Sequence, residues 1–419
     1  MTRHALLALA LLACAGDAKD APVDTDTDTE PTPTTFTVSV IVTDLDGEGL
    51  VLSLNGEELE VTEDGTYAFP TGLSSGANYD VQVVDQPTCP AQRCRVTGGF
   101  GTIPGADITG VQVSCGDPRL RAFTYSWGDS ALRVTDDVLG LEEDDAAVPR
   151  VISGPATALT GAALDALAWD ERREILYVVT PDAVLAFPDA QAAEGDVAPA
   201  RVLDLKGAGQ LEGIEIDAAT DRAYVCGSQG LHVVADLSLA DGEVIPVARV
   251  TDLPCNAIAR DPGADRLFVS GSYDGTLWSL DNAEGLIDEL APTRLASWTP
   301  DRDGFDGPAA VWFDECEDRL YVGSNWASPA GTTLYAFDDA DELDGPIDPE
   351  ATAAATFALS QAIVLAGDGT RALWVGEDSA RTLHRYTRAD RWEALVADEP
   401  ERSVEGLISS GYGVVFTTY

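Results

Sequence analysis

The stretch LEGIEIDAATDRAYVC, residues 211–226, decides the fold, because five other segments of the chain repeat its pattern. Each copy has an apolar strand, a polar turn that often contains Asp-Arg, and a second strand. The other copies begin at Leu164, Cys255, Pro308, Ser360 and Val404, and they read LDALAWDERREILYVV, CNAIARDPGADRLFVS, PAAVWFDECEDRLYVG, SQAIVLAGDGTRALWVG and VEGLISSGYGVVFTTY. They recur at intervals of roughly 44 to 53 residues, a spacing typical of repeat architectures.

A third strand follows most copies, as in AVLAFPD, GLHVVAD, GTLWSLD, TTLYAFD and TLHRYTR. A fourth run precedes the next copy, as in ARVLDL, VARVTDL, TRLASW and AATFAL. Four strands per period predict a six-bladed β-propeller over residues 118–419. We expect the last copy to end the chain at its second strand, while RAFTYSW, ALRVTDD and VPRVISG complete that blade and close the ring. Either end could supply the second strand.

Two segments between strands are similar to the NHL-type repeats of secreted bacterial proteins. They read FPDAQAAEGDVAPARVLDL and FDDADELDGPIDPEATAAATF. The resemblance covers nearly all of residues 118–419. It implies the fold of this region and leaves its activity open, because one fold hosts many functions.

Residues 36–116 predict a separate small β-sandwich. Short apolar runs such as FTVSVIV, LVLSLNG and YDVQVV are separated by Asn55-Gly56 and Asp64-Gly65, which are strong hairpin signals. About seven strands in this length indicate an immunoglobulin-like sandwich, so the whole chain is predicted to be all-β. The stretch from GLVLSLNGEE to ITGVQVSC resembles an Ig-like repeat of secreted bacterial lipoproteins. That resemblance implies a Cys94–Cys115 disulfide and leaves the partner of Cys89 open.

The chain begins MTRHALLALALLACAG, with an apolar run too short to cross a bilayer. Residues 11–14, Leu-Leu-Ala-Cys, resemble a bacterial lipobox, which implies that 1–14 is a lipoprotein signal and that Cys14 carries a lipid. The alternative is an ordinary secretory signal. Residues 15–35 are rich in Asp, Thr and Pro and predict a disordered tether. These features predict an exported protein, anchored by lipid at the outer membrane or cell surface.

The charge balance excludes nucleic acid as a partner. The chain has 25 Lys+Arg against 72 Asp+Glu, a formal net charge of −47, so a phosphate backbone would be repelled. Six cysteines besides Cys14 suggest disulfides in an exported chain. Cys226 ends a second strand and Cys255 begins the next inner strand at the same face, so we expect them to pair. Cys316 lies in a turn at the opposite face, and the sequence assigns it no partner.

The second residue of each copy is expected beside one mouth of the propeller channel, which we call the top face. These residues are Asp165, Glu212, Asn256, Ala309, Gln361 and Glu405. Most of them carry side-chain oxygens, which hard cations such as Ca²⁺ prefer. Leu211-Glu212-Gly213 and Pro254-Cys255-Asn256 resemble stretches of gluconolactonase-type propellers. That resemblance implies a channel metal held by Glu212, Asn256 and Glu405, whereas polar residues at a channel mouth can equally be solvated without a metal.

Two further candidate sites lie in loops of the propeller. In WTPDRDGFDG, residues 298–307, the carboxylates of Asp301, Asp303 and Asp306 are spaced to fold around a Ca²⁺ ion. The loop departs from the EF-hand pattern and could equally be a solvated turn. Aromatic and polar residues of the top face would suit a sugar or peptide, namely Tyr273, Asp274, Trp298, Phe305, Asn325 and Trp326.

The sequence favours a binding protein over an enzyme. No Ser occupies a nucleophile elbow, and His232 and His384 lie on third strands where side chains pack between blades. The leading hypothesis is a lipid-anchored scaffold whose top face binds a protein, peptide or glycan and which touches the membrane only through its lipid. The alternatives are a metal-dependent hydrolase of the lactonase type and a structural envelope component.

Overall fold

The chain is all-β, as predicted, in the part that the structure describes. The computed structural model describes residues 34–126, 128–141, 149–161, 163, 166–271, 274–285, 292–297, 307–324, 332–343, 353–357, 362–370, 372–377, 382–387, 402–405 and 411–418. Across these ranges the only helical segments are the 3₁₀ turns η1 (Val138–Gly140), η2 (Pro155–Thr157), η3 (Ala283–Gly285) and η4 (Ala340–Glu342). None of these described helices is long or apolar enough to cross a membrane.

The N-terminal unit contains two four-stranded sheets with a shared core. One sheet has the order β5 (Gly65–Ala68), β2 (Val38–Thr43), β10 (Ile108–Ser114) and β8 (Arg95–Thr97). The other has the order β4 (Glu57–Val61), β3 (Leu50–Leu54), β7 (Asn78–Asp85) and β9 (Phe100–Thr102). A short pair, β1 (Thr35–Phe36) with β6 (Leu73–Ser74), lies at one end. Alternate residues of β2 are buried, as a half-covered strand requires.

The described part of the C-terminal unit contains six sheets, and the strands of each sheet follow one another from the innermost outward. The first has β14 (Leu167–Asp170), β15 (Ile175–Val179), β16 (Val184–Pro188), β17 (Arg201–Leu205) and β21 (Gly242–Val244). The second has β18 (Leu211–Asp217), β19 (Arg222–Gly227), β20 (Gly230–Val234) and β22 (Ala248–Val250). The third has β23 (Ala257–Asp261), β24 (Arg266–Gly271), β25 (Thr276–Asp281) and β26 (Thr293–Ser297).

The remaining three sheets complete the ring. The fourth has β27 (Pro308–Asp314), β28 (Arg319–Ser324), β29 (Thr332–Asp338) and β30 (Ala353–Phe357). The fifth has β31 (Ala362–Gly367), β32 (Ala372–Glu377), β33 (Thr382–Thr387) and β34 (Arg402–Glu405). The sixth has β35 (Gly411–Thr418), β11 (Leu120–Ser126), β12 (Ala131–Thr135) and β13 (Arg150–Ile152).

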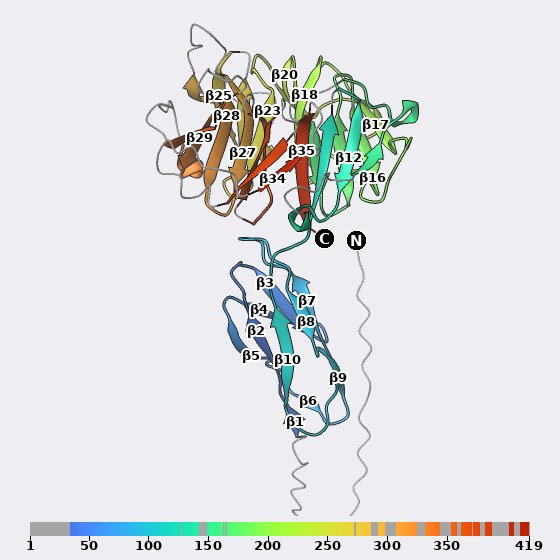
Figure 1. Ribbon diagram of the computed structural model, residues 1–419, viewed down its shortest axis with the longest axis vertical. Coiled ribbons are helices and arrows are strands. Elements are labelled where there is room, and N and C mark those ends of the chain that lie inside the picture. Colours follow the sequence, from blue (N-terminus) through green and yellow to red (C-terminus); the bar gives the residue numbers. More distant parts are fainter. Residues whose placement is uncertain are drawn as a thin grey trace, which may run out of the picture.

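The innermost strands form a closed circle, and the sheets radiate from it (Figure 1). Each innermost strand contacts the next one along the chain, and β35 contacts β14. The ring closes with a different assignment of strands from the one predicted. The chain end supplies only the innermost strand, β35, and β11 is the second strand of the closing sheet. The segment beginning at Val404 is therefore no inner-strand copy, because Val404 lies in β34, the outermost strand of the fifth sheet.

In the second, third and fourth sheets, an aspartate in the turn between the first and second strands helps to hold the sheet together. Asp221, Asp265 and Asp318 have positive φ angles of 57°, 52° and 48°, a conformation that a short polar side chain tolerates better than most. The Asp265 carbonyl accepts a hydrogen bond from Ala283 N at 2.9 Å, and its carboxylate accepts one from Glu284 N at 2.9 Å. This aspartate therefore fastens the turn to the segment that follows the third strand of the same sheet.

The sandwich is covalently joined to the ring. A disulfide links Cys89 of the sandwich to Cys316 in the β27–β28 turn, 227 residues away in sequence. Next to this disulfide, Ala91 N donates a hydrogen bond to Gly369 O in the β31–β32 turn at 2.6 Å. Both contacts lie on the face formed by turns between first and second strands, which we call the turn face. Figure 1 shows the sandwich below this face, with β1 at its far end.

The three disulfides bear out two predicted pairings and add one. Cys94 bonds to Cys115 within the sandwich, as its family resemblance implied. Cys226 bonds to Cys255 between neighbouring sheets at the face opposite the sandwich, as expected. The third bond, Cys89–Cys316, joins the two residues to which the sequence assigned no partners.

Replacing Asp265 by alanine should destabilise the ring by about 2–3 kcal/mol. The alanine variant loses the carboxylate that accepts the hydrogen bond from Glu284 N. Its backbone must also adopt the left-handed conformation of Asp265, which is unfavourable for alanine because alanine has no polar side chain to form a local hydrogen bond. Asp265→Asn keeps an acceptor oxygen and tolerates that conformation, so it should cost less than about 1 kcal/mol. Urea unfolding of both variants measures the difference. Equal destabilisation by alanine and asparagine would contradict this account of the turn.

Removing the disulfide between the units should loosen their junction and leave their cores intact. In Cys89→Ser/Cys316→Ser, we expect faster amide hydrogen exchange in residues 86–93 and 314–318, because the covalent restraint on these loops is lost. Peptides from β2 and β24 should exchange at the wild-type rate. Unchanged exchange in both loop segments would show that non-covalent contacts suffice to hold the junction.

Candidate functional site

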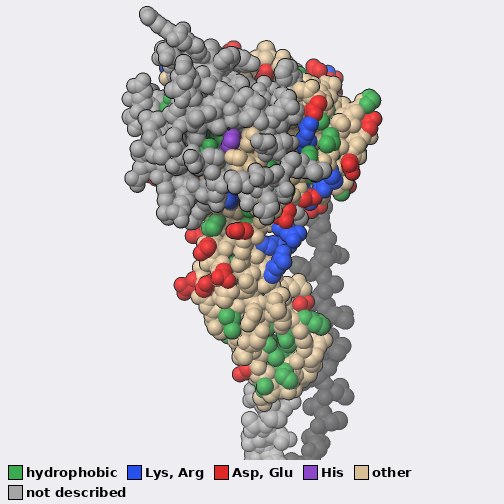
Figure 2. Space-filling view, in the orientation of Figure 1, with side chains coloured by type: hydrophobic (Ala, Val, Ile, Leu, Met, Phe, Trp, Pro, Cys, Tyr) green, Lys and Arg blue, Asp and Glu red, His purple; other side chains and the backbone are tan. Residues whose placement is uncertain are grey.

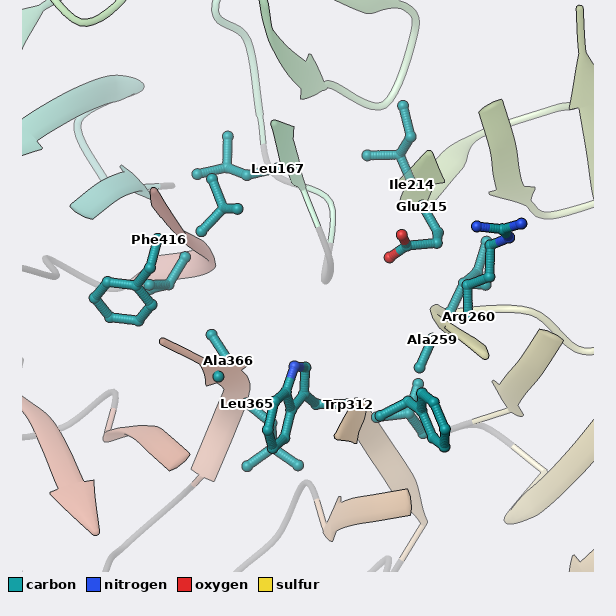
Figure 3. Close-up of a pocket in the computed structure, with 15 residues that line it drawn as sticks. Leu167, Ile214, Glu215, Ala259, Arg260, Trp312, Leu365, Ala366 and Phe416 are labelled. Carbon is teal, nitrogen blue, oxygen red and sulfur yellow. The ribbon is translucent and has the colours of Figure 1, made fainter. Parts of the chain in front are cut away.

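The central channel is enclosed by all six innermost strands. Its cavity has a volume of about 220 Å³ and is lined mostly by aliphatic residues from β14, β18, β23, β27, β31 and β35. Its lining also includes Glu215, Arg260 and Trp312 from three neighbouring strands, together with Phe313 and Phe416 (Figure 3). In this view the Glu215 carboxylate points toward the middle of the cavity.

Contacts within and between sheets hold two of these side chains. The Arg260 guanidinium lies 3.0 Å from a carboxylate oxygen of Asp217 on the preceding sheet and 3.6 Å from Glu284. The Trp312 ring stacks on Tyr321 with a centroid distance of 5.4 Å. A Cβ at Gly367 would lie 1.8 Å from the Trp312 ring, so only glycine fits at this crossing. Arg260 and Trp312 therefore contribute to packing between sheets as well as to the channel wall.

The predicted ring of oxygen ligands is only partly assembled. Glu212 and Asn256 occupy equivalent positions at the starts of neighbouring inner strands, as expected. Strand pairing places Ile363 at the equivalent position of β31, and Gln361 lies outside the described residues. Glu405 pairs with Thr382 at the outer edge of the fifth sheet, so its expected place beside the channel is wrong. The cause is that the fourth strand β34 has a sequence pattern similar to that of an inner strand, so the repeat by itself does not distinguish the two.

The two correctly placed side chains are buried. Glu212 is 9% exposed, and its carboxylate accepts a hydrogen bond from Gln210 Nε2 at 3.3 Å. Burial raises the pKa of Glu212 to about 7, because a charged carboxylate loses hydration there. Asn256 is 3% exposed, and its backbone N–H donates to Ser270 O at 2.8 Å. With this pKa, about half of the Glu212 carboxyl groups are protonated at pH 7, and metal ligation requires the deprotonated form.

The described residues do not fit a metal centre of the lactonase type. With Glu405 at the outer edge, only Glu212 and Asn256 of the expected set remain near each other. No group of three or more Asp, Glu, His or Cys side chains suited to a metal occurs within the described ranges. Asp165 and the loop carboxylates Asp301, Asp303 and Asp306 lie outside those ranges, so a calcium site in that loop stays a prediction.

Most of the predicted ligand-binding residues of the top face also lie outside the described ranges. These are Tyr273, Trp298, Phe305, Asn325 and Trp326. Asp274 is described: it is exposed in the β24–β25 loop and accepts a hydrogen bond from the Thr276 hydroxyl. Because β24 runs from the turn face to its end at Gly271, this loop lies on the face opposite the sandwich.

The two histidines of the ring are held by strand contacts. His232 is 0% exposed, its Nδ1 lies 3.1 Å from Gly230 O, and burial lowers its pKa. His384 Nδ1 lies 2.9 Å from the Ser403 hydroxyl on the adjacent strand. Both histidines lie within third strands, β20 and β33, as the sequence indicated.

Sequence reasoning missed the cavities on the turn face. One, of about 360 Å³, lies between the sandwich and the ring and is lined by Arg93, Pro118, Trp169 and Phe416 among others. Figure 2 shows basic side chains gathered where the two units meet, with acidic side chains beside them. The only sequence signal for this junction was the pair of cysteines without assigned partners.

Comparisons with known proteins assign no function to this chain. No protein-family model and no curated protein sequence matches the chain. Among solved structures, a chain of the nidogen/laminin complex is 12% identical with a TM-score of 0.48, covering 71% of this chain and 98% of that chain. The β-propeller domain of Myceliophteria thermophila Cps50 (Swd1) is 12% identical with a TM-score of 0.37, covering 54% of this chain and 66% of that one. Hydrazine synthase of Kuenenia stuttgartiensis is 13% identical with a TM-score of 0.39, covering 63% of this chain and 75% of that chain.

Glu212→Gln should stabilise the protein at high pH and have little effect at low pH. The pKa of Glu212 is about 4.5 in the unfolded chain and about 7 in the folded protein, so the folded state loses stability as the pH rises between these two values. Glutamine cannot ionise, so the variant should exceed wild type by up to about 3 kcal/mol at pH 8 and match it near pH 4.5. Urea unfolding at both pH values measures this, with exposed Glu194→Gln as control. A pH-independent difference would contradict the assignment.

Proposed function

We propose that this chain is an exported, lipid-anchored binding protein that displays its propeller away from the membrane. The observation that carries the proposal is the attachment of the sandwich to the turn face through Cys89–Cys316. With β1 at the opposite end of the sandwich, the N-terminal side of the described chain and the ring lie at opposite ends (Figure 1). A lipid on Cys14 would then leave the sandwich as a spacer between membrane and ring.

The face opposite the sandwich is the proposed binding surface. Second strands begin at the turn face and end at this free face, where the loops between second and third strands lie, including Asp274. Loops on a rigid scaffold are common places for recognition residues. Cys226–Cys255 joins neighbouring sheets at this face, which would keep its loops in fixed relative positions. A protein, peptide or glycan remains the proposed class of partner.

A binding role is favoured over the lactonase alternative by the arrangement of the channel. The lactonase hypothesis required Glu405 beside Glu212 and Asn256, and Glu405 lies on the outermost strand of its sheet. Arg260 and Trp312, which line the channel, are engaged in contacts between sheets, with Asp217 and Gly367 respectively. The proposal therefore contains no catalytic step.

Two labelling experiments test the proposed display. Cells fed radiolabelled palmitate should incorporate it into wild type and not into Cys14→Ser, because the thiol is the proposed acylation site. An amine-reactive biotin reagent that cannot cross membranes should label Lys206 on intact cells. Lys206 follows β17 at the free face and, with Lys19, is one of two lysines in the chain. Hydrogen bonds to Asp204 and Glu243 raise its pKa, so labelling should be run above pH 8.

Peptide mapping identifies the labelled lysine. Lys206→Arg is the matched control and should lose the label on the ring peptide while any label on Lys19 remains. Palmitate incorporation that does not depend on Cys14 would refute the anchor. Labelling of Lys206 only after lysis would refute display at the cell surface.

A further inference from the structure

Three cavities meet around one turn of the ring, at the end of β14 nearest the sandwich. Their volumes are about 360, 490 and 410 Å³, and Trp169 and Glu171 line all three. Each volume lies within the range of about 300–1,000 Å³ that is typical of small-molecule sites. We call the hollow that these cavities form the junction groove. It lies on the opposite side of the ring from the free face, and it shares Glu215 and Arg260 with the wall of the channel.

Trp169 forms an aromatic platform in the groove. One face of its indole stacks on Phe123, with a centroid distance of 5.1 Å and an interplanar angle of 21°. Phe123 is fully buried in the core of the ring, so this contact fixes the orientation of the indole. Trp169 itself is only half-buried, and its remaining surface lines the groove. A fixed aromatic surface of this kind binds an apolar face of a ligand at little entropic cost.

Charged groups of both signs surround this platform. Arg93 from the sandwich and Glu171 and Arg172 from the ring are exposed and line the groove. Among the described residues, none of these three side chains has an ion-pair or hydrogen-bond partner. Other arginines of the ring are paired, for example Arg121 with Asp136 and Arg385 with Asp368. In a chain with 72 acidic residues, arginines that face a groove without a carboxylate partner are available to a ligand.

The walls of the groove come from two units that are fixed to each other. The sandwich contributes Arg93 and the ring contributes Trp169, and the Cys89–Cys316 disulfide joins the loops beside them. The Ala91 N to Gly369 O hydrogen bond lies at the same wall, because both residues line the smallest of the three cavities. A groove with covalently fixed walls does not have to be ordered when a ligand binds.

From these observations we infer that the junction groove binds a short uncharged oligosaccharide. The apolar C–H face of a sugar ring would stack on Trp169. Sugar hydroxyl groups both donate and accept, so they would donate to the Glu171 carboxylate and accept from the guanidinium groups of Arg93 and Arg172. An anionic ligand would meet Glu171 and the net charge of −47, and a cationic ligand would meet the two arginines. Mixed charges beside an aromatic face therefore favour a neutral polyhydroxylated ligand.

Calorimetric titration of the intact purified protein tests the inference with three neutral trisaccharides: cellotriose, maltotriose and chitotriose. At least one should bind, and Trp169→Ala should weaken that binding about tenfold or more, since stacking is the main apolar contact. Glu171→Gln and Arg93→Ala should each weaken it about three- to tenfold. These two residues are exposed, so their variants should fold normally, which thermal unfolding verifies.

Arg95→Ala is the matched control. Arg95 is also exposed and lies two residues from Arg93, but it does not line the groove, so its loss should leave the affinity unchanged. Three results would overturn the inference: no heat with any trisaccharide, equal weakening by Arg95→Ala and Arg93→Ala, or binding only of a charged probe such as trigalacturonate. Binding that survives Trp169→Ala, Glu171→Gln and Arg93→Ala together would place the sugar elsewhere and would also refute it.

Discussion

The turn between the first and second strands of the second, third and fourth sheets is the interaction on which these sheets of the ring depend. Its first aspartate caps the turn, as when Asp217 accepts hydrogen bonds from Ala219 N and Thr220 N. Its second aspartate takes a left-handed conformation and binds the segment after the third strand, as Asp221 does with Ser238. Two aspartates that lie four residues apart, such as Asp217 and Asp221, thereby link the first, second and third strands of a sheet. The acidic residues of this repeat account for part of the large negative charge of the chain.

Closure of the ring decides which residues can meet in the channel. The chain end contributes one strand, β35, which pairs along its length with β11. This arrangement joins the two ends of the ring by backbone hydrogen bonds. It also moves Glu405 to the outside of the neighbouring sheet, which removes the third member of the proposed metal set. The same register brings Val414 and Phe416 to the channel wall.

The junction between sandwich and ring gives the molecule two distinct faces. A disulfide that closes a loop of 227 residues holds the sandwich against the turn face. The opposite face stays clear of the sandwich, which supports its proposed role in binding. The turn face gains a groove whose walls belong to different units, with Arg93 on one side and Trp169 on the other. Neither unit alone would contain both groups.

The sequence by itself determined the all-β class, the repeat of the ring and the Cys226–Cys255 disulfide, because each leaves a local pattern, while the Cys94–Cys115 disulfide was implied by a family resemblance. Strand alternation, the Asp-Arg turn and the position of Cys226 at a strand end are readable within a few residues. Only the tertiary structure decided the closing register, the pKa of Glu212, the Cys89–Cys316 bond and the groove around Trp169. These depend on burial and on contacts between segments far apart in sequence, and no local pattern specifies which distant segments pack together.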